Sequence, residues 1–285
     1  MKSTLKVWTT LGLATALAGA GLAGCAGESG EGGEGGEGAE TSQTGEAGEG
    51  EGGEGEGGEG EAGAGDGEGG VAISEAASDP VEYGAALAIV EAHAIAARDA
   101  YLAGEAEAAA EMFGHPVSEV LSDMEPVFAE LGVANFTASL NEAAAAALKK
   151  DNASGVEAAF ENVLAALSAA ALKAPEGDLS QGAVAAGIVA DQLDRATAMY
   201  GKAAGSDIYE PYLDGYGFYK AAKSAFERDG SAIKTYNSGL HADIKAGLNL
   251  LADAYPSATR PDTLDAEQGK LLGAASKVKL GLPVG

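Results

Sequence analysis

The chain of 285 residues contains a single cysteine, Cys25. One cysteine cannot form a disulfide within the chain, so it is left for a reactive, buried or modified role. Basic residues are also scarce, because 17 Lys and Arg face 44 Asp and Glu, for a formal net charge of −27 at pH 7. So acidic a chain is not expected to bind nucleic acid or anionic lipid surfaces.

Motifs of known catalytic types are missing as well. The sequence contains neither Gly-x-Ser-x-Gly nor His-Glu-x-x-His, the patterns of a hydrolase nucleophile and of a zinc protease. Its Gly-rich stretch is acidic and lacks the Lys that a phosphate-binding loop needs. We therefore expect a protein that is not an enzyme.

The first 24 residues have the three parts of a secretory signal. Lys2 and Lys6 form a positive start, an apolar segment covers residues 7–22, and Gly-Leu-Ala-Gly at 21–24 precedes Cys25. A membrane-spanning helix needs about 20 predominantly apolar residues, and this segment is shorter. The pattern predicts a lipoprotein signal peptide that is cleaved before Cys25, followed by acylation of the Cys25 thiol.

A lipidated Cys25 predicts where the protein is found. Each buried CH₂ of an acyl chain adds about 0.8 kcal/mol of membrane affinity, so two or three chains give lasting attachment. The next residue is Ala26, where Asp would signal retention in an inner membrane. We expect a membrane-anchored lipoprotein on the periplasmic or cell-surface side, in the outer membrane if the source has two membranes.

Residues 26–70, called the tether below, consist almost entirely of Gly and Glu. They include fourteen acidic residues but no Lys, Arg, aromatic or large aliphatic residue. Such a segment cannot bury enough apolar surface to offset the entropy of ordering, so the region 25–70 is predicted to be a disordered acidic linker. About 45 Gly-rich residues span roughly 40 Å or more. A spacer is favoured over a cation trap, because isolated Glu residues without a fixed cage bind cations poorly.

Residues 71–285 form the predicted folded part. They are rich in Ala and Leu, and their apolar residues recur at helical spacing without convincing alternation at period two. Short connections between amphipathic helices predict an all-α domain, an antiparallel bundle of about eight helices. The expected helices cover residues 79–104, 105–113, 116–131, 136–150, 156–173, 179–204, 209–228, 232–254 and 263–279. The main expected interruptions are Gly114-His115-Pro116, Pro126 and Asp229-Gly230.

The first candidate site is at the expected helix break around His115. Glu119 follows one helical turn later, and Glu125 follows further along the same segment. His93, on the preceding long helix, can face the same region across the helical hairpin. Two imidazoles with one or two carboxylates suit Fe, Zn, Cu or Mn. The alternative is that His115 caps a helix and His93 is a packed histidine.

The second candidate site is an aromatic segment. Tyr212, Tyr216 and Tyr219 share one helical face, and phenolate oxygens can bind ferric iron. Glu210 or Asp214 beside them can supply carboxylate ligands. The alternative is an aromatic packing stripe in the core.

In its helical pattern and these candidate residues, the folded part resembles imelysin-like and related all-helical periplasmic proteins that are associated with iron uptake. The resemblance rests on Gly114-His115 with Glu119, and on the segment 209–218. The imelysin signature is Gly-x-His-x-x-Glu, whereas this chain has Gly-His-x-x-x-Glu. The resemblance implies a helical periplasmic domain that handles iron.

Two functions stay open from the sequence. The first is a lipid-anchored helical binding protein for iron or another transition metal, with His93, His115, Glu119 and Glu125 as ligands and Tyr216 as a more distant candidate. The second is a structural or interaction protein of the cell envelope that contacts an envelope protein and needs no metal. The first requires the two histidines to converge with Glu119 within a few ångströms.

Overall fold

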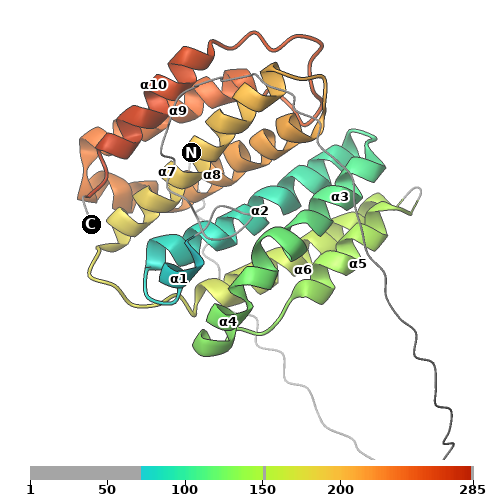
Figure 1. Cartoon of the computed structure of the whole chain (residues 1–285), viewed down its shortest axis with the longest axis horizontal. Coiled ribbons are helices and arrows are strands. Elements are labelled where there is room, and N and C mark those ends of the chain that lie inside the picture. The colour runs from blue at the N-terminus through green and yellow to red at the C-terminus, as the bar shows by residue number, and fades with distance from the viewer. Residues whose placement is uncertain (1–71, 150–151, 284–285) are drawn as a thin grey trace, which may run out of the picture. The chain divides into compact units, whose positions relative to one another are not determined.

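The computed structural model describes residues 72–149 and 152–283. The predicted signal peptide (1–24), Cys25 and the tether lie outside the described residues, so what was predicted for them stays a prediction. Within the described part all regular elements are helical and pack as a bundle, which confirms the predicted all-α fold (Figure 1). None of the helices in this part has both the length and the apolar character that a membrane crossing demands.

The described elements in chain order are α1 (Ile73–Ala76), α2 (Pro80–Leu102), α3 (Ala106–Pro116), the π-helical segment η1 (Val117–Leu121), α4 (Ser122–Leu131), α5 (Thr137–Ala147), α6 (Ala153–Ala171), α7 (Gln181–Ala204), α8 (Glu210–Tyr236), α9 (Ser238–Ala254) and α10 (Gln268–Leu280).

Helix α2 is the central element of the fold. It contacts α3, η1 and α6 of one group of helices and α7 and α8 of another (Figure 1). Most of its residues are buried and many of them are Ala, as expected of a helix enclosed by neighbours on nearly all sides. The helix begins where the sequence predicts, because the side chain of Asp79 accepts a hydrogen bond of 2.7 Å from the amide of Val81, next to Pro80.

The two groups approach α2 closely enough for side chains from both to meet around it. On one side of α2 lie α3 and α6, with α5 packed against both of them, and on the other side α7, α8, α9 and α10 pack together. Gly217 of α8 faces α2 so closely that an added Cβ would lie 2.5 Å from the carbonyl oxygen of Ala92. A residue without a side chain at this position therefore sets the distance between α8 and α2.

The predicted helix break at Gly114-His115-Pro116 is wrong. Helix α3 continues through Pro116 into the π-helical segment η1, which leads directly into α4. Because Pro116 has no N–H, a normal helical hydrogen bond is missing there, and the wider π turn accommodates this without ending the helix. As a result, His115 and Glu119 lie one turn apart on a continuous helical path. Pro126 likewise lies inside α4 and does not split it.

The predicted helix end at Asp229-Gly230 is also wrong. Helix α8 continues to Tyr236, and α9 begins after Asn237, whose side chain accepts hydrogen bonds from two backbone amides at 3.0 and 3.1 Å. A Gly inside a helix costs about 1 kcal/mol relative to Ala. Burial of Ile233 in the next turn offsets this cost, because its side chain lies fully inside the core.

The connection from α9 to α10 is longer than predicted, because α10 does not begin at residue 263 but five residues later. Two tyrosine hydroxyls of the aromatic segment hold this connection. Tyr209 donates to the carbonyl of Ala258 at 2.7 Å, and Tyr212 donates to that of Ser257 at 2.9 Å. These tyrosines therefore stabilise packing at the N-terminal end of α8. This agrees with the alternative interpretation of the aromatic segment as a packing stripe in the core.

Candidate metal centre

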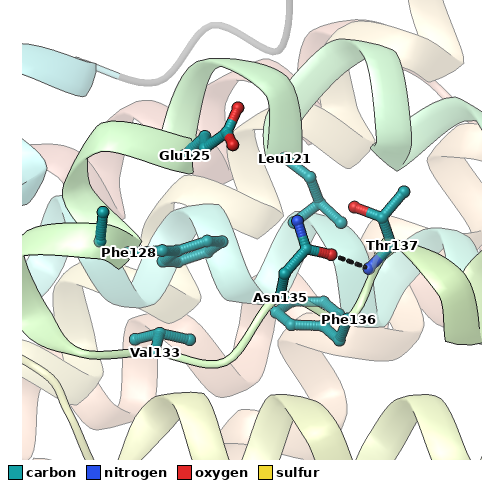
Figure 2. Close-up of a pocket in the computed structure, with 8 residues that line it drawn as sticks. Leu121, Glu125, Phe128, Val133, Asn135, Phe136 and Thr137 are labelled. Atoms are coloured by element: carbon teal, nitrogen blue, oxygen red, sulfur yellow. Dashed lines mark hydrogen bonds between the residues drawn. The ribbon is translucent and has the colours of Figure 1, made fainter. Parts of the chain in front are cut away.

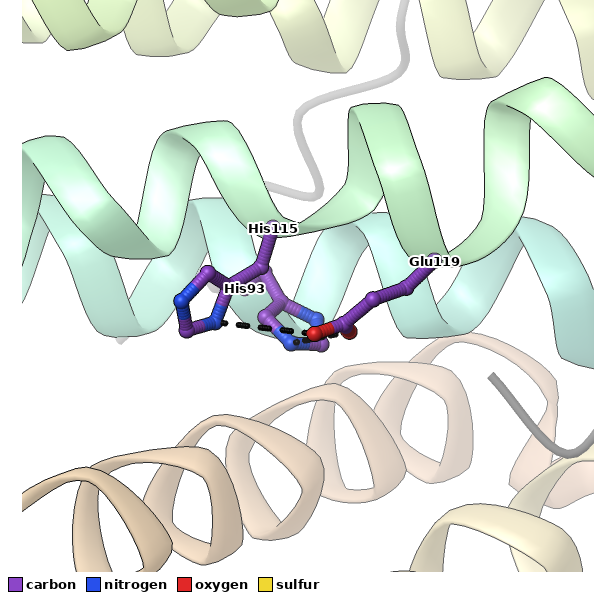
Figure 3. Close-up of side chains that lie close together, drawn as sticks. All are labelled: His93, His115 and Glu119. Atoms are coloured by element: carbon purple, nitrogen blue, oxygen red, sulfur yellow. Dashed lines mark ion pairs between the residues drawn. The ribbon is translucent and has the colours of Figure 1, made fainter. Parts of the chain in front are cut away.

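Three of the predicted ligands converge: His93 from α2, His115 from α3 and Glu119 from η1 (Figure 3). Each offers a nitrogen or oxygen atom, and these three atoms lie within 4.8 Å of one another. Nε2 of His93 is 3.6 Å from one carboxylate oxygen of Glu119, and Nδ1 of His115 is 3.9 Å from the other. This is the convergence that the metal-binding hypothesis requires.

His93 is the buried member of the group, with a side chain that is 3% exposed. Its Nδ1 lies 2.8 Å from the carbonyl oxygen of Ile89. A carbonyl oxygen can only accept, so Nδ1 must carry the hydrogen, and Nε2 is the nitrogen that faces the site. Edge contacts with the rings of Phe218 at 5.6 Å and His115 at 5.9 Å hold the imidazole in this orientation.

The charge of His93 follows from its burial. Removal from water lowers the pKa of His93 below its ordinary value, against the opposing influence of the Ile89 carbonyl and of Glu119. A neutral imidazole with hydrogen on Nδ1 presents the lone pair of Nε2 to the Glu119 carboxylate. At 3.6 Å the two atoms are too far apart for a hydrogen bond. Two electron-rich atoms that face each other in this way favour a cation between them.

The other two members are more accessible. The side chains of His115 and Glu119 are 23% and 35% exposed. The two residues are four apart along the helix that continues through η1, so their side chains project from the same side toward His93 (Figure 3). The site therefore has a buried side at α2 and a more exposed side at η1.

Helix α8 brings two carboxylates to the same site. Asp214 Oδ1 lies 3.6 Å from His93 Nε2, and Glu210 Oε1 lies 3.9 Å from His115 Nε2. The sequence placed both acids beside the tyrosines and not beside the histidines. Their spacing of four residues was the available signal, because it puts both carboxylates on one face of a helix.

Asp214 is in an unusual environment for a carboxylate. Its Oδ1 is buried and receives no hydrogen bond from any described residue. Burial, followed by the negative charges of Glu210 and Glu119, raises the pKa of Asp214 from 3.8 to about 7, against the lowering influence of Lys202. The carboxylate is therefore poorly stabilised as an anion in the metal-free protein.

The structure does not bring Glu125 into this group. Glu125 lies on α4 at the edge of an apolar pocket of about 140 Å³, next to Leu121 and Phe128 (Figure 2). Tyr216 is engaged elsewhere, because its hydroxyl donates a hydrogen bond of 2.6 Å to Asp99. Burial and the Asp99 carboxylate raise the pKa of Tyr216, which opposes formation of the phenolate that would bind iron.

No protein-family model, curated protein or solved structure matches this chain. The resemblance to imelysin-like proteins therefore stays a prediction.

Proposed function

We propose that this protein binds a divalent transition-metal ion through His93, His115 and Glu119. The observation that supports this most directly is the convergence of three ligand atoms from three helical segments, with one imidazole buried and oriented by a backbone carbonyl. A backbone carbonyl or carboxylate on the second nitrogen is the usual environment of a metal-bound histidine.

The ligand set favours certain ions. Two imidazole nitrogens and a carboxylate oxygen suit Fe²⁺, Zn²⁺, Mn²⁺ or Co²⁺, whereas the soft Cu⁺ ion prefers thiolate or thioether ligands. Iron is the ion that the resemblance to imelysin-like proteins implies. The general affinity order of divalent ions at nitrogen and oxygen ligands places Zn²⁺ and Co²⁺ above Fe²⁺ and Mn²⁺.

The predicted location gives this binding a role at a membrane. A lipid on Cys25 would hold the protein at the membrane surface, and the tether would let the helical domain reach partners some distance away. The partial exposure of the His115 and Glu119 side chains supports capture and release of an ion rather than permanent retention. We therefore propose a non-enzymatic, lipid-anchored protein that binds iron or another transition metal and hands it on in the cell envelope.

Metal analysis and calorimetric titration of the purified full-length chain test this proposal. We expect one tightly bound Zn²⁺ or Fe²⁺ per chain, and loss of this binding in His115→Ala. Glu125→Gln is the matched control, because Glu125 lies outside the group, and it should bind as the wild type does. A His93→Ala/His115→Ala double variant measures the weak binding contributed by the fourteen tether carboxylates.

The competing hypothesis is an envelope interaction protein in which these side chains form only a polar network. It predicts no stoichiometric metal, and it predicts equal titration curves for the wild type and for His115→Ala. Either result would refute the proposed metal-binding function.

A further inference from the structure

We propose that Asp214 of α8 is the fourth protein ligand of the metal centre. This inference rests on the proposed function, and it adds a residue that lies 95 positions or more from the other three ligands along the chain. An ion bound in this way would also join α8 to α2, α3 and η1.

The distances around His93 support this assignment. Nε2 of His93 is 3.6 Å from Glu119 Oε2 and also 3.6 Å from Asp214 Oδ1. In a tetrahedral site with metal–ligand bonds of about 2.1 Å, two ligand atoms lie about 3.4 Å apart. Each carboxylate is therefore separated from this nitrogen by nearly the spacing of ligands that share an ion. Both are too far from it for direct hydrogen bonds. Asp214 lies outside the set of ligand atoms that are within 4.8 Å of one another, so its side chain would have to move toward the other ligands when the ion binds.

The environment of Asp214 gives an independent reason. Its Oδ1 is buried, points to the histidine and receives no hydrogen bond from the part of the chain that the structure describes. A buried carboxylate oxygen without a partner is costly, and native proteins rarely retain one without a ligand or a function. A cation between Asp214 and His93 would satisfy this oxygen.

The outer contacts of both histidines fit the same arrangement. His93 uses Nδ1 for the Ile89 carbonyl, which leaves Nε2 for the ion. His115 faces Glu119 with Nδ1 and Glu210 with Nε2, at 3.9 Å each. At 3.9 Å Glu210 is too far from His115 for a hydrogen bond, so it would act on this imidazole only through its negative charge.

The charges balance for a divalent ion. Two neutral imidazoles and the carboxylates of Glu119 and Asp214 bring two negative charges, which a divalent cation neutralises. Without Asp214 the three remaining ligands would leave one positive charge at the buried end of the site, next to the core. Such an uncompensated charge is unfavourable where water is excluded.

The test compares Asp214→Asn with Asp229→Asn, which makes the same chemical change on α8 beside Arg228, at a distance from the site. Zn²⁺ titration of the full-length chains should show a loss of affinity of at least about 100-fold for Asp214→Asn, since even outer partners of metal ligands contribute 10–100-fold. Glu210→Gln, which removes a charge 3.9 Å from His115, should lose less than about 10-fold, and Asp229→Asn should match the wild type.

Co²⁺ provides a readout of coordination. The wild-type chain should give the strong visible absorption of four-coordinate Co²⁺, and Asp214→Asn should lose intensity as water replaces the carboxylate. Wild-type affinity and an unchanged Co²⁺ spectrum in Asp214→Asn would overturn the inference. If His93→Ala and Glu119→Gln still lost binding, the proposed function would stand without Asp214. Absence of tight binding in the wild type would instead remove the proposed function itself.

A second measurement needs no variant, so it remains decisive if Asp214→Asn fails to fold. Hydrogen exchange of the wild-type chain is compared with and without Zn²⁺. If Asp214 binds the ion, amides of α8 around it should exchange more slowly with Zn²⁺, together with those near His93 and Glu119. Slower exchange only in α2, α3 and η1 would overturn the inference.

Discussion

Asp214 should make the metal-free protein less stable at neutral pH than at acidic pH, and Asp214→Asn should remove this effect. The cause is burial, which raises the pKa of Asp214 from 3.8 to about 7, with the charges of Glu210 and Glu119 acting in the same direction. A carboxyl group whose pKa is higher in the folded state binds its proton more tightly there than in the unfolded chain.

The sign and size of the effect follow from this difference. Well below pH 3.8 the Asp214 carboxyl is protonated in both the folded and the unfolded state, so it does not change the free energy of unfolding. As the pH rises from 3.8 to about 7, the unfolded chain loses the proton first, so the free energy of unfolding falls. Between pH 4.5 and pH 8 the loss from this one group should be about 3 kcal/mol. Asn is neutral throughout, so its variant should escape this loss.

Urea denaturation of the full-length chain in the presence of a chelator, at several pH values from 4.5 to 8, measures this effect. The quantity of interest is the difference between the unfolding free energies of Asp214→Asn and the wild type, because pH effects common to both cancel in it. This difference should rise by about 3 kcal/mol across the range in favour of the variant. Asp229→Asn should show no such rise. Parallel profiles for Asp214→Asn and the wild type would show that the carboxylate is adequately solvated in the folded state.

Three further predictions concern packing, the tyrosine and the anchor. Gly217→Ala should destabilise the protein by about 2 kcal/mol in urea denaturation, because the added Cβ would press on the Ala92 carbonyl. The control is Gly273→Ala on α10, where no atom lies within 4 Å of the added Cβ, and it should stabilise the protein by up to about 1 kcal/mol. Equal effects of the two substitutions would show that α8 moves freely relative to α2. Tyr216→Phe should lose about 1 kcal/mol of stability with its hydrogen bond, yet keep the Zn²⁺ affinity of the wild type; reduced affinity would restore Tyr216 as a ligand. Cys25→Ser should move the protein from the detergent phase to the aqueous phase in partitioning experiments, and retention in the detergent phase would contradict lipidation.

The fold class could be predicted from the sequence because it depends on local signals. Helical spacing of apolar residues and a cap such as Asp79-Pro80 act within a few residues, and they were sufficient for the all-α bundle. The errors occurred where packing overrides a local signal. Pro116 and Gly230 both favour a helix end, but the wide turn of η1 accommodates the first, and core burial on α8 carries the helix past the second.

The site could be predicted in part for the same reason. His115 and Glu119 are neighbours on one helix, and His93 lies on the helix before them, so a hairpin brings all three together. Asp214 is more than 90 residues away, and only the packing of α8 against α2 brings it to His93. Glu125 has suitable chemistry and lies close in sequence, but α4 presents it beside an apolar pocket instead.

The burial of His93, which destabilises the metal-free fold, also distinguishes a binding site from a packing arrangement. Apart from tyrosines, the buried polar residues in the described part of the chain are His93, Gln192 and Thr197. Thr197 donates to the carbonyl of Leu193 at 2.9 Å. The side-chain nitrogen of Gln192 donates to Asp191 at 2.8 Å, while its Oε1 is buried without a hydrogen-bond partner among the described residues. His93 directs Nε2 at the carboxylates of Glu119 and Asp214, which are too far away at 3.6 Å for a hydrogen bond. An apolar residue at this position of the Ala-rich helix α2 would stabilise the metal-free fold better, whereas the proposed cation would convert the same unfavourable arrangement into ligand bonds. The buried imidazole of His93, which destabilises the metal-free fold, is thus the side chain that the proposed metal ion would need.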